Sequence, residues 1–239
     1  MSTLNLLYQT EYQISENLSV VIPTVGQVLD NEDEYYSMVT AFTAMPIDLM
    51  VQLEDLNLDF ETMTDWELFL LLSNSMRTQD TSLILKDISF STFQLDANEE
   101  TQELFLRDTQ SDVIIDRAAY YQISAVLRKI HNIKKNTRKP GNQEAKEYML
   151  KRAREKQKRA LKRKTDSQTE ALIVAMVNSP EYKYDYDSTR ELTIYQFNKS
   201  VNQIVKRVDY NNKMFGVYTG NIDPKNLSRD DLNWLTGKI

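Results

Sequence analysis

Hydrophobic positions in the first eighty residues recur at the three- and four-residue spacing of amphipathic helices. After Asn31, five apolar side chains fall on one helical face: Tyr35, Met38, Val39, Phe42 and Met45. Pro46 then ends that helix or opens another, Ile47 to Leu56. Capping pairs, in which a short polar residue precedes Glu or Gln by three positions, predict three helix starts: Thr24 with Gln27, Asn31 with Glu34, and Thr64 with Glu67.

Between Leu83 and Ile115 the period changes to two, which is the spacing of strands. Apolar and polar residues alternate from 83 to 95 and again at Leu104 and Leu106, with the turn-forming residues 96–99 between them. We therefore expect one or two β-hairpins here. Before them, Ser19 to Pro23 forms a short extended stretch, since a residue before proline avoids helical backbone angles. Helical spacing resumes after this region and predicts a helix from about Asp116 to near Asn136.

The clearest break in the chain is Pro140-Gly141-Asn142. Beyond it, residues 144–178 read as one long helix, whose basic half has a thin apolar stripe and should project from the body. A further capping pair, Thr193 with Gln196, opens the best amphipathic helix, which Gly220 ends. Ser228 is expected to cap a short final helix.

These elements predict an α+β, mostly α-helical protein. Residues 1–136 form a mixed helical domain with a small β-hairpin or sheet, 137–142 form a linker, and 143–239 form a helical C-terminal region. That region begins with the basic helix and contains the amphipathic one.

Charge is sorted unevenly along the 239 residues, although the whole chain has a net charge of only −6. Residues 134–164 hold 14 of the 29 Lys and Arg but 3 of the 35 Asp and Glu, which gives +11 there and −17 elsewhere. Such sorting indicates a charged partner, a second copy of the chain, or a solvated helix. The candidate contacts to nucleic acid or to an acidic partner are Lys151, Arg152, Arg154, Lys158, Arg159, Lys162 and Arg163.

The residues offer little catalytic chemistry. Cysteine is absent and His131 is the single histidine, which excludes disulfides, thiolate metal sites and multi-histidine metal sites within one chain. His131 is expected on the polar, solvated side of its helix. The pair Asp185 and Asp187 lacks the glycine and distal glutamate of an EF-hand, and no phosphate-binding glycine loop occurs. We therefore predict a non-enzyme without catalytic, metal or cofactor residues.

No membrane partner is expected, because the longest apolar run, Ala171 to Val177, is far shorter than the roughly 20 residues that a bilayer needs. The amino terminus lacks the basic start of a signal peptide. A cytoplasmic location is therefore predicted.

Several segments resemble proteins encoded among the tail genes of phages that infect Gram-positive bacteria: Ile22 to Leu29, Thr43 to Leu49, Asp116 to Tyr120, Arg138 to Asn142, and Leu192-Thr193-Ile194-Tyr195-Gln196-Phe197 through to Trp234-Leu235. Within that group the chain is most similar to tail assembly chaperones. The resemblance implies a small helical protein that coats the tape-measure protein in the cytoplasm of the infected host before the tube polymerises. It carries no catalytic residues.

Three hypotheses follow. The first is a non-catalytic assembly factor that binds the tape measure or another tail protein through the run 171–177 and the apolar face formed by Ile194, Phe197, Val201, Ile204, Val205 and Val208. The second is a nucleic-acid-binding regulatory or packaging protein that uses residues 134–164. The third is a structural component of the mature tail or baseplate, which would reside in the virion. A homo-oligomer is compatible with each.

Overall fold

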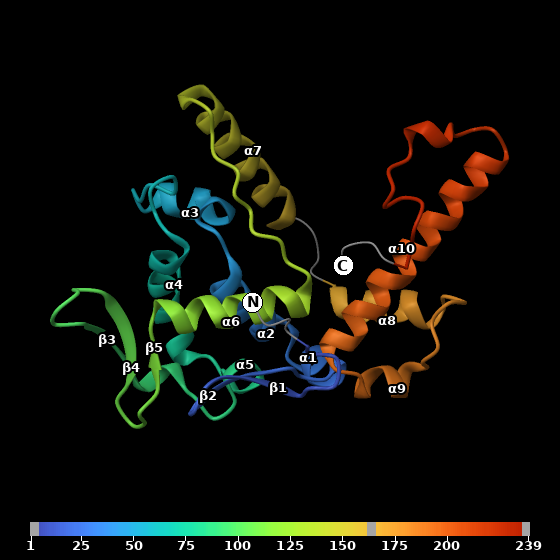
Figure 1. The fold of residues 1–239 in the computed structure, drawn as a ribbon. Helices are drawn as coiled ribbons and strands as arrows, with labels where there is room; N and C mark the ends of the chain where they lie inside the picture. Colours follow the sequence, from blue (N-terminus) through green and yellow to red (C-terminus); the bar gives the residue numbers. More distant parts are fainter. Residues whose placement is uncertain (1–4, 162–165, 236–239) are drawn as a thin grey trace.

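The computed structural model describes residues 5–161 and 166–235, and their elements confirm an α+β, mostly helical protein (Figure 1). The first part contains β1 (Glu11–Ser15), β2 (Leu18–Val21), α1 (Val25–Asp30), α2 (Glu32–Thr43), α3 (Met50–Asp55), α4 (Asp65–Ser73) and α5 (Ser82–Leu85). The second contains β3 (Phe93–Ala97), β4 (Leu104–Asp108), β5 (Ile114–Ile115), α6 (Arg117–His131), α7 (Gln143–Leu161), α8 (Gln168–Val177), α9 (Tyr186–Glu191) and α10 (Ile194–Tyr218). The strands pair as two small antiparallel sheets, β1-β2 and β3-β4-β5.

A helix begins at each of the four predicted places, and three of them have the predicted capping bonds. Thr24, Thr64 and Thr193 each accept a hydrogen bond from the backbone three residues on, and the Gln or Glu there bonds back. Asn31 makes no such bond, so the predicted Asn31–Glu34 capping box is wrong. The side-chain amide of Asn31 instead donates to the Gln27 carbonyl at 3.1 Å, at the end of α1. Three acidic residues in the first turn of α2 interact favourably with the dipole of that helix.

The predicted hairpin is confirmed for β3 and β4, but residues 82–92 are not a strand. They form α5 and a 3-10 turn, Phe90–Thr92. Ile84 and Leu85 are both fully buried, and adjacent residues of a strand point to opposite faces, whereas a helical turn can bury both. Lys86 ends this turn at a φ of 59°. Strand β1 was not predicted, and it pairs with the expected extended stretch.

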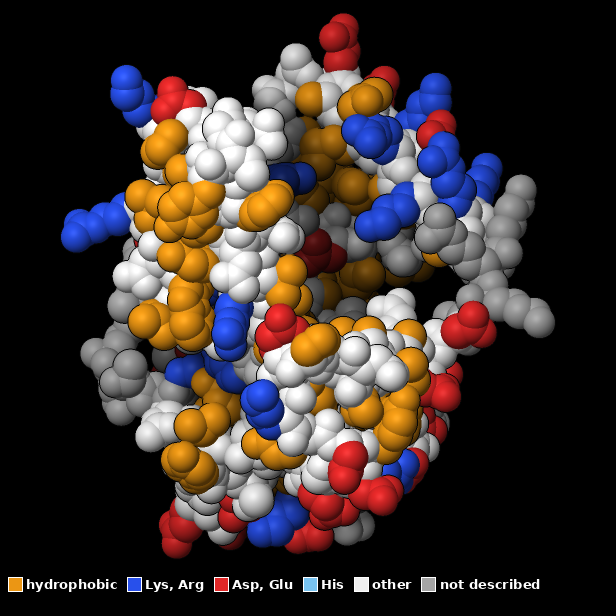
Figure 2. All heavy atoms as spheres, turned by 90° about the vertical axis from the view of Figure 1, so that its right-hand side faces the viewer, with side chains coloured by type: hydrophobic (Ala, Val, Ile, Leu, Met, Phe, Trp, Pro, Cys, Tyr) orange, Lys and Arg blue, Asp and Glu red, His pale blue; other side chains and the backbone are white. Residues whose placement is uncertain are grey.

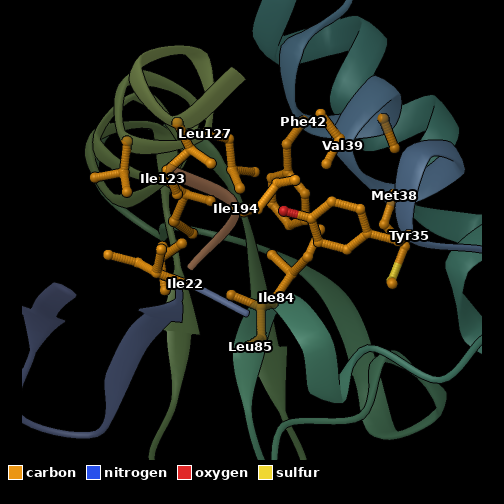
Figure 3. Packing of buried hydrophobic residues seen from close by; sticks show 14 of the residues in the cluster. Ile22, Tyr35, Met38, Val39, Phe42, Ile84, Leu85, Ile123, Leu127 and Ile194 are labelled. Carbon is orange, nitrogen blue, oxygen red and sulfur yellow. The ribbon is translucent and has the colours of Figure 1, made fainter. Parts of the chain in front are cut away.

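One main hydrophobic core holds the two halves together (Figure 3). Residues 137–142 join α6 to α7 without helix or strand, as expected of a linker. Ile173, Met176 and Ile194, from beyond this segment, nevertheless pack in the same cluster as Tyr35 and Leu127. The start of α10 is fixed to the amino-terminal half by the backbone bonds of its flanks: the amide of Val25 donates to the Leu192 carbonyl, and that of Ile194 donates to the Pro23 carbonyl, both at 2.8 Å.

Three predicted helix bounds in the second half are wrong. α6 stops at His131 because Asn132 adopts a left-handed conformation, φ 54°. The single helix 144–178 is divided, since Asp166 and Ser167 are not helical and Ser167 caps α8 through the Glu170 amide. Ser228 does cap a turn, accepting from the Asp231 amide, but residues 229–235 continue as turns and not as a helix.

His131 is partly buried between two tyrosine rings, so the predicted position on the solvated side of its helix is wrong. Its ring packs against Tyr35 and Tyr36, with ring centroids 5.5 Å from each, and its Nε2 is 2.9 Å from the Tyr35 hydroxyl. Burial lowers the pKa of His131 to about 4. His131 lies four residues after the buried Leu127, so both side chains are on the core face of α6.

Candidate partner-binding surfaces

The predicted partner-binding face lies on α10, and the structure divides it into a covered and an open half. Ile194 and Phe197 are each 1% exposed and belong to the main core, so a partner cannot reach them. Val201 and Ile204 are partly buried against that core. Val205 and Val208, by contrast, are 60% and 38% exposed. The prediction therefore needs correction at its first two residues.

The apolar spacing of α10 continues beyond the predicted residues. Phe215 and Tyr218 lie seven and ten positions after Val208, in register with Ile194 and Phe197, and are 69% and 85% exposed. We call Val205, Val208, Phe215 and Tyr218 the distal face. The heptad spacing was a signal available in the sequence for the last two, which the prediction missed.

Another side of α10 is covered by the chain that follows it. Lys213 binds Asp209 and Asp231 at 2.6 Å each, Gln203 donates to the Trp234 carbonyl at 3.1 Å, and Arg207 lies over the Trp234 ring. The hydrogen bond from Lys213 is the largest cause of a lowered pKa at Asp231. This C-terminal segment therefore stiffens the emergent half of α10, yet the distal face stays exposed.

The basic helix α7 leaves the body at the top of Figure 1 but is anchored at its base. Leu150, 7% exposed, packs in a second cluster with Ile47, Val51 and Phe60. Lys146 binds Asp59 at 3.1 Å and Glu61 at 2.8 Å. These contacts agree with a helix that is attached along one narrow stripe.

Few of the predicted cationic side chains form ion pairs within the protein. Arg154 binds Asp55 at 2.8 Å, and Arg159 lies 3.9 Å from Glu155, a long contact between exposed groups. Among the residues that the structure describes, the remaining cations of α7 have no acidic partner: Lys151, Arg152, Lys156 and Lys158. Lys162 and Arg163 of the prediction lie outside the described residues.

A groove of about 1160 Å³ separates α7 from α3 and the segment before α7. Its apolar lining comes from Ile47, Met50, Val51, Tyr148, Met149 and Ala153, and its cationic lining from Arg138, Arg152, Lys156 and Arg159. Figure 2 shows Lys and Arg side chains along the rim of a hollow with hydrophobic side chains in its depth. We call it the α3–α7 groove. The sequence indicated its basic wall but not its apolar one, because α3 is brought there by tertiary packing.

A second hollow, of about 720 Å³, lies beside His131. Its polar groups are engaged in structural bonds: Glu32 accepts from the Thr169 amide at 2.8 Å, and Asn198 donates to the Ile130 carbonyl at 3.0 Å. Burial works to raise the pKa of Glu32, but hydrogen bonds from Ser167 and Thr169 outweigh it and lower that pKa. The polar groups around this hollow therefore join α2 to α8 and α6 to α10.

The structure also places the other predicted features. Within the run 171–177, Ile173 and Met176 are buried, whereas Leu172 and Val174 are 36% and 44% exposed. Asp185 caps α9 by accepting from the Ser188 amide at 2.8 Å. In the described ranges, no three His, Asp or Glu side chains gather in a way that could hold a metal ion, and no helix there has the length and hydropathy to cross a membrane.

With these surfaces in view, comparison of the chain with known protein families, curated proteins and solved structures gives no significant match.

Proposed function

We propose that this protein is a non-catalytic phage tail assembly factor that holds an apolar helix of a tail structural protein on the distal face of α10. The observation that carries the proposal is that the apolar stripe of α10 is longer than the core that covers it. Its first two turns are buried, and the same heptad register then continues through Val208, Phe215 and Tyr218 in solvent.

A helix is the partner that suits this surface. Exposed apolar residues gathered on one side of a helix are typical of interaction sites, and residues spaced by three, four and seven contact a second helix along its length. Asn211 occupies the heptad position between Ile204 and Tyr218. A polar residue inside such a contact selects register and partner at some cost in stability.

The phage assignment is supported by the resemblance of the segments named above. A tape-measure protein is long, helical and apolar along its faces, so it aggregates unless another protein covers it. An exposed stripe that projects from a rigid body is suited to that task, because it presents a pre-ordered helix without unfolding of the core.

The test is co-expression with a fragment of a phage tape-measure protein, scored by the fraction of the fragment that stays soluble. Val208→Asp should abolish the protection. Leu71→Asp is the matched control, since Leu71 is also an exposed apolar residue of a helix, 43% against 38%, and lies on α4, outside the predicted partner-binding segments. Equal protection by wild type and Val208→Asp, or an insoluble fragment in every case, would refute the proposal.

A second candidate function, nucleic-acid binding, is favoured by the unpaired cations of α7. Phosphate contacts through Lys151, Arg152, Lys156 and Lys158 would release counterions, so the affinity would fall steeply with salt. A mobility-shift titration at two salt concentrations separates this candidate from the first. Absence of a shift at low salt removes it.

A further inference from the structure

We infer that the α3–α7 groove receives the tip of the β3-β4 hairpin from a second copy of this chain. The inference does not depend on the distal face of α10, because no residue of that face lines the groove or belongs to the hairpin. It rests on the complementary chemistry of two unpartnered surfaces of one molecule.

The hairpin carries an apolar surface beyond the end of its core contact. Leu95 pairs with Leu106, and Ala97 pairs with Leu104, so these four side chains share one face of the sheet. Leu106, near the base, is 5% exposed, whereas Leu95 and Leu104 are 55% and 43% exposed. The face that packs on the core therefore continues past it and lies uncovered.

The same tip is acidic and well ordered. Residues 96–104 contain Asp96, Glu99, Glu100 and Glu103 and no Lys or Arg, which gives a charge of −4. The Asn98 side chain accepts from the amides of Glu100 and Thr101 at 2.9 and 3.0 Å. The turn is thus held in one conformation before any contact, which reduces the entropy lost on binding.

The groove carries more cations than carboxylates. Its lining holds Arg138, Arg152, Lys156 and Arg159 against Asp48, Glu155 and Asp166. The apolar side chains of Met50 and Val51 line it as well. Two exposed leucines flanked by carboxylates match an apolar floor flanked by cations, both in hydrophobicity and in sign of charge.

The two surfaces cannot satisfy each other within one molecule. The hairpin lies at the far left of Figure 1, while α7 rises from the top of the body and packs on α3. The contact must therefore form between copies. Because a hairpin meets a groove and not another hairpin, the interface is heterologous, and each pair keeps one free hairpin and one free groove for further copies.

Sedimentation velocity over a range of protein concentrations tests the inference, at about 50 mM and about 500 mM salt, since screening weakens contacts between exposed charges. The hairpin variant is Glu99→Lys with Glu100→Lys and Glu103→Lys. The groove variant is Arg152→Glu with Lys156→Glu and Arg159→Glu. Each alone should weaken self-association at least roughly tenfold, because three exposed ion pairs become repulsive.

Mixing the two variants should restore association, because reversed hairpins then meet reversed grooves and wild-type hairpins meet wild-type grooves. The matched control for the hairpin variant is Glu16→Lys with Glu191→Lys and Asp230→Lys, which changes the net charge by the same amount and sign and should associate like wild type. Circular dichroism verifies that each variant is folded. A wild-type chain that stays monomeric at low salt, variants that associate as well as wild type, or a mixture that does not recover would each overturn the inference.

Discussion

Acidification should destabilise this protein through one side chain, His131. Its imidazole is buried against Tyr35 and Tyr36, and burial lowers its pKa to about 4. In the unfolded chain the same group has an ordinary pKa of about 6.5. At a pH between these two pKa values, the imidazole is protonated in the unfolded state and neutral in the folded state. The free energy of unfolding is therefore intact above pH 6.5 and decreases as the pH falls toward 4.

The magnitude follows from the difference between the two pKa values. Each pH unit within the window costs up to about 1.4 kcal/mol, so the loss between pH 7 and pH 5 is about 2 kcal/mol. The loss of stability can be assigned to His131, because the chain has one histidine and no cysteine. Carboxylates titrate mainly below this range, and the pKa of Glu32 and of Asp65 are lowered further by their hydrogen bonds, after burial has acted in the opposite direction.

Urea denaturation at half-unit steps from pH 7.5 to about 5 measures the effect, in the range where the linkage principle applies. His131→Gln is the control, because a glutamine does not titrate but can still pair with the Tyr35 hydroxyl. The variant should show an almost constant free energy of unfolding over this range. NMR titration of the single imidazole reports its folded pKa directly.

Two results would refute the reasoning. A wild-type free energy of unfolding that is unchanged between pH 7 and pH 5 would mean that the folded imidazole titrates normally. An equal loss in wild type and His131→Gln would assign the pH dependence to other groups.

Three further predictions concern stability. Leu150→Ala should release α7, because it removes a buried leucine that packs this helix on the body; hydrogen exchange should rise in 143–161, with a local loss of about 2–5 kcal/mol. Gly216→Ala should loosen residues 222–235 in the same assay, since the added methyl would lie 2.6 Å from Ile222, whereas Gly141→Ala, with open space, should not. Arg128→Met should lower the free energy of unfolding by about 1–3 kcal/mol in urea titrations, because the Thr43 carbonyl at the end of α2 loses its buried donor.

Local chemistry decided much of what could be predicted. The pairs at Thr24, Thr64 and Thr193 mark helix starts because the capping bond joins residues only three positions apart, whatever surrounds them. The β3-β4 turn is likewise held by Asn98 and its neighbours. The local pattern at Ile84 and Leu85 was compatible with a strand or a helical turn. Packing against the core favours the helical turn, because it buries both side chains.

The candidate surfaces show the limit of this reasoning. In the sequence, Ile194 and Phe215 are equivalent positions of one heptad stripe, and nothing local distinguishes them. The fold covers the first with α6 and α1 and leaves the second in solvent. The environment of His131 and the apolar wall of the α3–α7 groove could not be predicted from the sequence for the same reason. The sequence by itself determined where helices begin, which faces are apolar and where positive charge gathers. Only the tertiary structure decided which of those faces stay open, because burial depends on where distant parts of the chain come to lie.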